Sequence, residues 1–161
     1  MNDRVQILLV DDNPSDAELT LHVLSRHFAG RIGGNADNAA ERIADHIKVV
    51  HDGAEALDFI FCTGAYAARN PQDLPQTMLL DLKLPIVSGF EVLRWLRGQP
   101  EFEALPVVVL SSSTRDEDRS KVRELGANAY LEKPGSLLEF PTVVEYLKKR
   151  WLDVEDETAR T

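Results

Sequence analysis

Five short and mostly apolar runs recur along this chain, with enough residues between consecutive runs for a helix. They read ILLV at 7–10, IKVV at 47–50, MLL at 78–80, VVVL at 107–110 and AYL at 129–131. Runs of this length without regular polar alternation are typical of strands that are covered on both faces. The segments between them carry apolar residues at helical spacing. This alternation predicts an α/β fold, a parallel sheet with helices on both faces.

Capping residues mark where the helices are expected to begin. An Asn or Ser side chain can accept a hydrogen bond from the first helical turn, and Pro suits the first helical position. In chain order the expected starts are Asn13-Pro14, Ser88-Gly89, Thr114 with Glu117, and Ser136 with Glu139. Gly126 is expected to end the helix before the fifth strand. Residues 29–40 are predicted to be a loop that either extends the first helix irregularly or is an insertion. Residues 63–77 are predicted to be a long loop, and long loops in compact domains often serve function.

Composition limits the classes of function. A chain of 161 residues can form one domain with a substantial core. Its formal net charge of −9 argues against nucleic acid as a partner. The single cysteine, Cys62, leaves no disulfide framework or cysteine-based zinc site. We see no signal peptide and no apolar run near the ~18 residues of a membrane span. We therefore expect a cytoplasmic protein that does not bind membranes.

Charged and hydroxyl side chains follow the predicted strands where they end. Asp11 and Asp12 follow the first strand, Asp81 the third, Ser111 the fourth, and Lys133 the fifth. Parallel sheets bind ligands beyond the carboxyl ends of their strands, so these groups should meet. Three close carboxylates repel one another and take up protons unless a cation relieves them. Hard oxygen ligands suit Mg²⁺ or Mn²⁺ better than zinc.

The same groups suit the transfer of a phosphoryl group. That reaction needs an oxygen nucleophile, a metal ion, and donors for the negative charge on the transferred group. Asp81 would be the nucleophile, Lys133 and Ser111 the donors, and Asp11 with Asp12 the metal holders. This hypothesis explains why a carboxylate follows a buried strand in LLDLKLP at 79–85.

Each residue also has an ordinary interpretation. Asp11 or Asp12 could cap the following helix, and Ser111 could be a turn residue. Lys133 could be solvated, and Tyr130 could be a core aromatic. The combination favours chemistry, because separate strand ends supply all the groups that phosphoryl transfer requires.

Four motifs together resemble those of two-component response-regulator receiver domains. They are VDD at 10–12, DLKLPIVSG at 81–89, SSS at 111–113 and YLEKP at 130–134, and the resemblance covers about residues 5–150. It implies a doubly wound (βα)5 flavodoxin-like sheet with strand order 2-1-3-4-5. We expect a receiver domain over 1–150 and a tail over 151–161.

The resemblance also implies roles at the metal site. Asp81 would accept phosphate from a histidine kinase. Asp12, Asp81 and the backbone carbonyl of Lys83 would ligate Mg²⁺ directly, while Asp11 would act mostly through water. The Lys83 side chain could reach over the phosphoryl group and affect attack by water, or it could be solvated.

The implied switch uses the last two strands. Lys133 would pair with the phosphoryl group and Ser111 would hydrogen-bond it. Tyr130 would swing inward as Ser111 moves, which would alter the surrounding surface.

Two further features resemble the stand-alone regulators of phytochrome-type kinases. These are the loop at 63–77 and the ending KKRWL, although the stretch 29–46 is longer than that group suggests. The expected partner is then a histidine kinase, with a bacteriophytochrome as one candidate. No output domain fits after residue 150, so output would pass through a protein surface, for example to a downstream phosphotransfer protein. Trp151-Leu152 could form a homodimer contact or pack on the last helix of its own chain.

Two other functions remain alternatives. A pseudo-receiver would bind partners without phosphorylation, but the acidic residues, with Asp81 and Lys133, argue against it. A haloacid-dehalogenase-like phosphatase needs an acid two residues after its nucleophile, where this chain has Lys83. A flavin-binding flavodoxin is disfavoured because Asp11 and Asp12 would repel the flavin phosphate. The receiver is expected to be a signalling phosphoacceptor, not an enzyme acting on other substrates.

Overall fold

A computed structural model describes residues 7–32, 47–112 and 115–133 of the chain. These residues form a five-stranded sheet of order β2-β1-β3-β4-β5, in which every neighbouring pair is parallel. The strands are β1 (Ile7–Val10), β2 (Ile47–Val50), β3 (Thr77–Leu80), β4 (Val107–Ser111) and β5 (Ala129–Glu132). The predicted fold class and strand order are confirmed.

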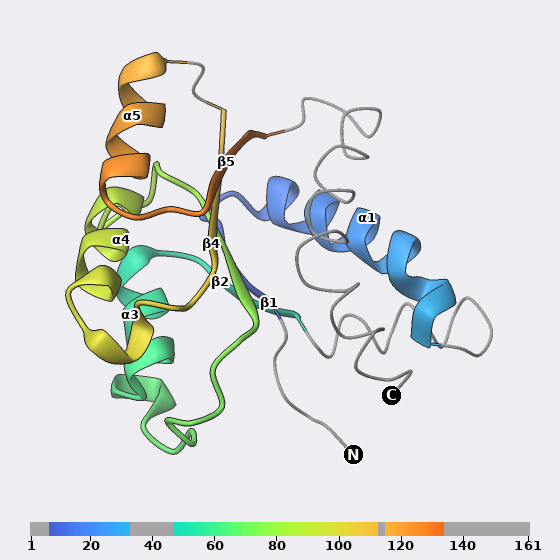
Figure 1. Cartoon of the computed structure of the whole chain (residues 1–161). Coiled ribbons are helices and arrows are strands. Elements are labelled where there is room, and N and C mark those ends of the chain that lie inside the picture. The colour runs from blue at the N-terminus through green and yellow to red at the C-terminus, as the bar shows by residue number, and fades with distance from the viewer. Residues whose placement is uncertain (1–6, 33–46, 113–114, 134–161) are drawn as a thin grey trace, which may run out of the picture.

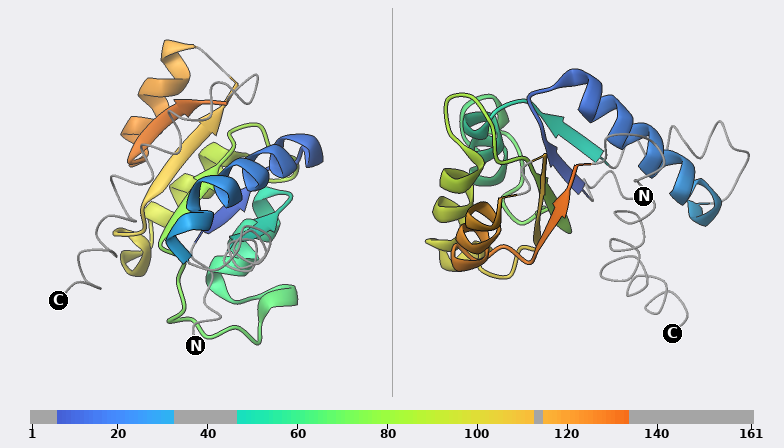
Figure 2. Two further views of the ribbon diagram at one scale, coloured as in Figure 1. Left: turned by 90° about the vertical axis from the view of Figure 1, so that its right-hand side faces the viewer. Right: turned by 90° about the horizontal axis from the view of Figure 1, so that it is seen from above.

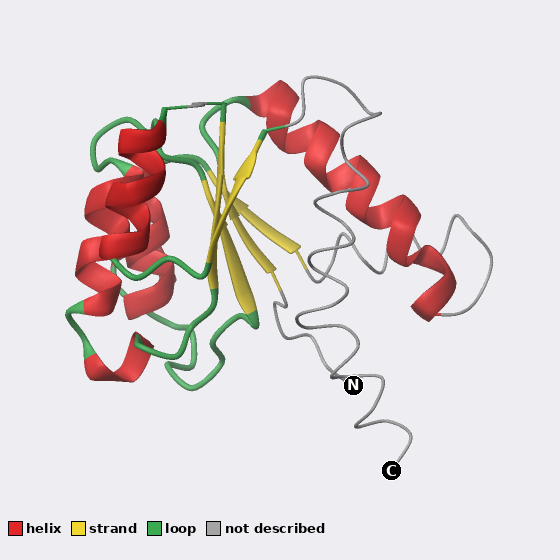
Figure 3. Cartoon of the chain, turned by 45° about the horizontal axis from the view of Figure 1, so that its top comes forward, coloured by secondary structure: helices red, strands yellow, loops and turns green. Residues whose placement is uncertain are grey.

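Helices cover both faces of the sheet. Helices α3 (Gly53–Phe61), α4 (Gly89–Arg97) and α5 (Asp116–Glu124) lie on one face, and α1 (Pro14–Ile32) lies on the other (Figures 1 and 3). Two 3₁₀ turns, η1 (Gly64–Tyr66) and η2 (Pro100–Phe102), lie in the connections before β3 and β4. Figure 2 shows the same layers from two further directions. None of the helices in the described part of the chain is long and apolar enough to span a membrane.

Alternate residues of each strand point to opposite faces, and the core is therefore divided in two. The cluster facing α3, α4 and α5 takes from the sheet Leu8, Val10, Val50, Met78, Leu80, Val107 and Val109. The cluster beneath α1 takes from the sheet Leu9, Ile47, Leu79, Val108 and Leu110, which pack with Ala17 and Leu24. Burial on both faces explains why these strands read as continuous apolar runs.

Several predicted helix ends are confirmed. The Asn13 side-chain oxygen accepts hydrogen bonds from the backbone N–H groups of Ser15 at 2.9 Å and Asp16 at 3.2 Å. The Ser88 hydroxyl accepts one from the N–H of Glu91 at 3.3 Å. After α5, Gly126 has a φ of 99°, which favours glycine. The Asn13 and Ser88 caps fix the starts of α1 and α4, the helices that follow the strand-end aspartates in the chain.

Two predictions about helix boundaries need correction. Helix α1 continues to Ile32, so residues 29–32 are not loop but extend the first helix, which is the alternative that the sequence left open. The glycine at position 30 lowers helix propensity by only about 1 kcal/mol, and the neighbouring Ala29 and Arg31 favour helix. Helix α5 begins at Asp116 with Arg115 at the capping position. Thr114 and the expected helix after Ser136 lie outside the described residues.

Candidate functional site at the carboxyl ends of the strands

Asp11 and Asp81 stand one residue beyond two neighbouring strands, and their backbones continue the sheet. The N–H of Asp11 donates to the Val50 carbonyl, and that of Asp81 donates to the Val10 carbonyl, both at 3.1 Å. Val10 lies opposite Leu80 in the register of β1 and β3. The two aspartates are therefore held side by side, and both are buried, with 1% of Asp11 and 6% of Asp81 exposed.

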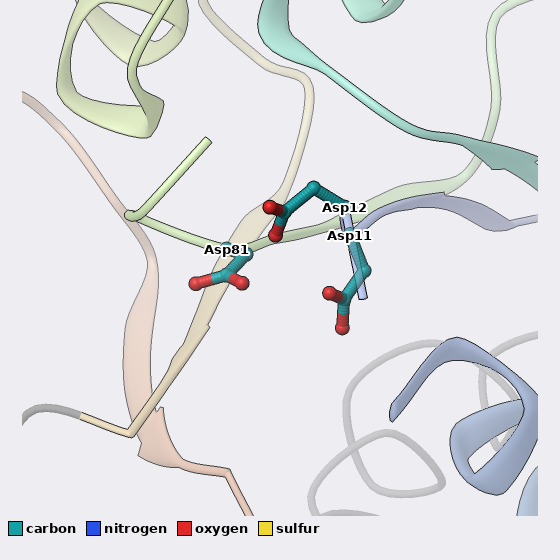
Figure 4. A group of neighbouring side chains, drawn as sticks. All are labelled: Asp11, Asp12 and Asp81. Carbon is teal, nitrogen blue, oxygen red and sulfur yellow. The ribbon is translucent and has the colours of Figure 1, made fainter. Parts of the chain in front are cut away.

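Asp12 completes a group of three carboxylates. One oxygen each from Asp11, Asp12 and Asp81 lies within 4.8 Å of the other two. Figure 4 shows the three side chains. Oxygens that share one Mg²⁺ at 2.0–2.1 Å lie at most about 4.2 Å apart. The group thus fits a small hard cation after a slight approach of one carboxylate, or with a water molecule between one carboxylate and the ion. The predicted convergence of these residues is present in the structure.

Lys133 reaches this group from the carboxyl end of β5, the strand at one edge of the sheet. Its Nζ lies 2.8 Å from Asp81 Oδ2, 3.0 Å from Asp11 Oδ2 and 2.9 Å from Asp16 Oδ2. Although burial alone would lower it, the three carboxylates hold the pKa of Lys133 well above its usual value. Lys133 is therefore a fixed positive charge directly at the Asp81 carboxylate.

The Asp11 carboxyl is held in an unfavourable environment for its charge. Burial raises the pKa of Asp11, although the N–H of Asn13 at 3.0 Å and the Lys133 ammonium both favour the carboxylate. The negative charge of Asp81 adds to the increase. A site with this balance gains from a further positive charge, which is the physical reason for expecting a cation there.

The carboxylate of Asp16 is the part of the site that the sequence did not reveal. Asp16 lies in the first turn of α1, where an acidic residue is ordinarily explained by the helix dipole. Its position three residues after the Asn13 cap was the only available signal. The contact with Lys133 joins residues 117 positions apart and emerges only from the fold.

Ser111 ends β4 next to Lys133. Its side chain is fully buried, and its carbonyl accepts a hydrogen bond from the Lys133 N–H at 2.7 Å. This pairing of β4 with β5 brings the predicted hydroxyl donor and ammonium donor to the same rim. Tyr130 lies half-buried on β5 against the core that faces α5, with the Arg119 guanidinium 4.9 Å from its ring centre.

The loop after β3 is tightly held beside Asp81. The Lys83 N–H donates to Asp81 Oδ1 at 3.2 Å, while the Lys83 side chain is exposed. Ile86 has a φ of 69°, and the adjacent Val87 N–H bonds to the Pro85 carbonyl at 2.8 Å, which forms a γ-turn. The N–H of Gly89 donates to the Leu82 carbonyl at 3.0 Å, closing the loop.

The structure therefore unites Asp11, Asp12, Asp81 and Lys133, and places Ser111 beside them. It places the Lys83 peptide against Asp81. Trp151 and Leu152, the predicted dimer contact, lie outside the described residues.

Comparison with protein families gives a match to the response regulator receiver domain over residues 38–145. Among curated proteins, the probable methanogenesis regulatory protein FilR2 of Methanothrix harundinacea is 35% identical over 147 residues, which cover 91% of this chain and 83% of that protein. Response regulator Rcp1 of Synechocystis sp. is 31% identical over 147 residues, covering 91% of this chain and 88% of Rcp1.

Solved structures show the same relationship. The phosphorylated cyanobacterial phytochrome response regulator RcpA aligns with a TM-score of 0.75 and 29% identity, covering 94% of this chain and 96% of RcpA. The Mn²⁺-bound form of Rcp1 aligns with a TM-score of 0.69 and 30% identity, covering 92% and 94% of the two chains.

Proposed function

Because the chain belongs to the response-regulator receiver domain family, we propose that it is a single-domain response regulator that accepts a phosphoryl group from a histidine kinase on Asp81. The observation that carries this proposal is the arrangement around that residue. Asp81 is buried, lies beside the Asp11 and Asp12 carboxylates, and has one oxygen 2.8 Å from the Lys133 ammonium. A carboxylate with these neighbours can act as an acceptor at which negative charge is compensated.

The proposed transfer would use Asp81, Lys133 and Ser111. A carboxylate oxygen of Asp81 forms the new P–O bond as the P–N bond to the donor histidine breaks. The Lys133 ammonium and the Ser111 hydroxyl would contact oxygens of the transferred group. Such contacts compensate the charge that spreads over those oxygens during transfer.

A divalent cation would be held by the same carboxylates. Asp12, Asp81 and the Lys83 carbonyl are the proposed direct ligands of Mg²⁺ or Mn²⁺, with Asp11 acting mostly through water. When bound, the ion would neutralise charge on the phosphoryl oxygens. Support comes from the three-carboxylate group and from the Mn²⁺-bound form of the similar protein Rcp1.

The proposed switch runs through Ser111 and Tyr130. Movement of Ser111 toward the phosphoryl group would let Tyr130 turn inward and change the surface between β5 and α5. Output would then depend on protein partners that recognise this surface, such as a downstream phosphotransfer protein. The chain would act as a signalling phosphoacceptor in the cytoplasm, not as an enzyme with separate substrates.

We propose a phytochrome-type kinase as the phosphate donor, with a bacteriophytochrome as one candidate. The similarity to RcpA, a phytochrome response regulator, supports this choice. We further propose that 1–150 form the receiver domain and that Trp151-Leu152, in the tail over 151–161, contact a second copy. Light scattering of the full chain and of a chain ending at 150 tests the dimer; a monomer in both would contradict it.

The central test is phosphorylation by a small donor. The protein is incubated with acetyl phosphate and Mg²⁺, and its intact mass is measured beside an Asp81→Asn variant and a sample with EDTA. We expect a gain of one phosphate that is labile to hydroxylamine and absent from both controls. A wild-type protein that gains no phosphate would instead favour a pseudo-receiver that binds partners without phosphorylation.

A further inference from the structure

Asp16 is a fourth carboxylate at the site, and the proposed phosphoryl transfer assigns it no role. Its Oδ2 lies 2.9 Å from Lys133 Nζ. Its backbone is fixed in the first turn of α1, because the N–H bonds to the Asn13 side chain at 3.2 Å and the carbonyl accepts the Thr20 hydroxyl at 3.0 Å. Asp16 is thus built into a position from which it contacts Lys133.

Asp16 differs from the other partners of Lys133 in two respects. Its side chain is 42% exposed, whereas those of Asp11 and Asp81 are 2% and 8% exposed. In addition, the group of three carboxylates that could share a cation comprises Asp11, Asp12 and Asp81, not Asp16. Two partners of Lys133, Asp11 and Asp81, would therefore also hold a cation, whereas the third, Asp16, would not.

This difference matters because an ammonium and a divalent cation compete for the same oxygens. The three hydrogens of the Lys133 ammonium match its three carboxylate partners. When a cation draws Asp11 and Asp81 toward itself, Asp16 remains available to Lys133. Without Asp16, the positive charge of Lys133 would rest on the metal-site carboxylates alone and would oppose the cation more strongly.

The charge of Asp16 also acts directly. Two oxygens that both contact one nitrogen can lie no further apart than roughly 6 Å, so Asp16 is close to Asp81. At that range a negative charge attracts a cation at the site, even with partial screening by solvent. Holding Lys133 and attracting the cation directly should therefore both raise the affinity of the site for a divalent cation.

We propose that Asp16 is a positioning residue that holds Lys133 to the side of the site and so raises the affinity of the Asp11–Asp12–Asp81 group for a divalent cation. The inference rests on the proposed function, because it concerns the metal site of the proposed acceptor. It concerns the unphosphorylated protein and can be tested without phosphorylation.

The test measures Mn²⁺ binding by the unphosphorylated full chain, using electron paramagnetic resonance of the free ion. Asp16→Asn is compared with Glu18→Gln, which removes an exposed charge from the same helix. Among the described residues, Glu18 is not one of the carboxylates that pair with Lys133. We expect Asp16→Asn to weaken Mn²⁺ binding on the order of three- to tenfold, and Glu18→Gln to weaken it less than twofold.

A second comparison asks whether Asp16 acts through Lys133. In a Lys133→Met background the competing ammonium is absent, so Mn²⁺ should bind more tightly than in the wild type. Adding Asp16→Asn there should then have a smaller effect than in the wild type. A role confined to the start of α1 would instead lower the melting temperature and leave Mn²⁺ affinity unchanged.

The outcomes separate this inference from the proposed function. Equal Mn²⁺ affinities of Asp16→Asn and Glu18→Gln would overturn the role of Asp16, while normal phosphorylation of the wild type would leave the acceptor proposal intact. An equal effect of Asp16→Asn with and without Lys133 would overturn the positioning mechanism. A wild-type protein that binds no Mn²⁺ would overturn both the inference and the proposed metal site.

Discussion

Gly89 provides the sharpest test of how the proposed acceptor, Asp81, is held. A Cβ atom at this position would lie 2.3 Å from the Asp81 carbonyl oxygen and 2.7 Å from Leu82 Cα. Ordinary contacts of a Cβ begin at 3.4 Å, so Gly89→Ala requires the backbone at Asp81 to move by about 1 Å. The atoms in the way belong to the main chain and cannot turn aside as a flexible side chain could.

The expected cost follows from two contributions. Overpacking of this kind costs about 1–3 kcal/mol, and weakening the hydrogen bond from Gly89 to Leu82 costs about 1 kcal/mol. Gly89→Ala should therefore destabilise the protein by about 2–4 kcal/mol. A shift of 1 Å at the nucleophile should also slow phosphorylation by acetyl phosphate on the order of 100-fold.

Gly98→Ala is the matched control. The nearest atoms to its added Cβ are carbonyl oxygens at 3.4 and 3.5 Å, and its φ of −79° suits alanine. We expect it to be neutral or to stabilise the protein by about 0.5 kcal/mol. Urea unfolding and phosphorylation rates of both variants give the comparison. If their stabilities agree within about 0.5 kcal/mol, the steric argument for Gly89 is refuted.

Of three further predictions, one concerns a hydrogen bond between η1 and α3, and two concern the loop after Asp81. Burial and a 2.7 Å hydrogen bond to Glu55 raise the pKa of Tyr66 to about 12; because this exceeds the usual value near 10, the bond should lose stability as pH rises between about 10 and 12. Tyr66→Phe should cost about 1 kcal/mol at pH 7 and show a smaller alkaline loss in urea unfolding, and an equal loss in both proteins would contradict this. Since Ile86 has a positive φ, Ile86→Gly should be at least as stable as Ile86→Ala, whereas glycine is ordinarily about 0.5–1 kcal/mol worse; a less stable glycine variant would argue against the γ-turn. Lys83→Ala should leave stability within about 0.5 kcal/mol and change the rate of phosphate loss from Asp81, and an unchanged rate would make Lys83 a solvated side chain.

The sheet and most of the site could be predicted from the sequence, because both depend on local patterns. Buried strands appear as apolar runs, and the parallel register of β1 and β3 brings Asp11 and Asp81 together once both strands are located. Lys133 follows from the same reasoning applied to β5.

Other features depend on relationships that no local pattern encodes. The contact of Asp16 with Lys133 requires the placement of α1 over the sheet relative to the end of β5. The positive φ of Ile86 contradicts the preference of a β-branched residue, and only the closed loop between Asp81 and Gly89 imposes it. Helix α1 continues past Gly30, a residue type that ordinarily disfavours the interior of a helix, and its length therefore could not be read from the sequence.

The main-chain attachment of Asp81 has a consequence for signalling. Its N–H donates to the Val10 carbonyl of β1, and its own carbonyl lies so close to Gly89, at the start of α4, that a Cβ atom there would be 2.3 Å from it. The backbone of the proposed acceptor is therefore held in place, so a structural change caused by phosphorylation would have to occur elsewhere. We expect the ends of β4 and β5 to move instead, and to move together, because the Lys133 N–H donates to the Ser111 carbonyl. Strain introduced at the centre of the sheet would thus be relieved toward its β5 margin, where other proteins can sense it.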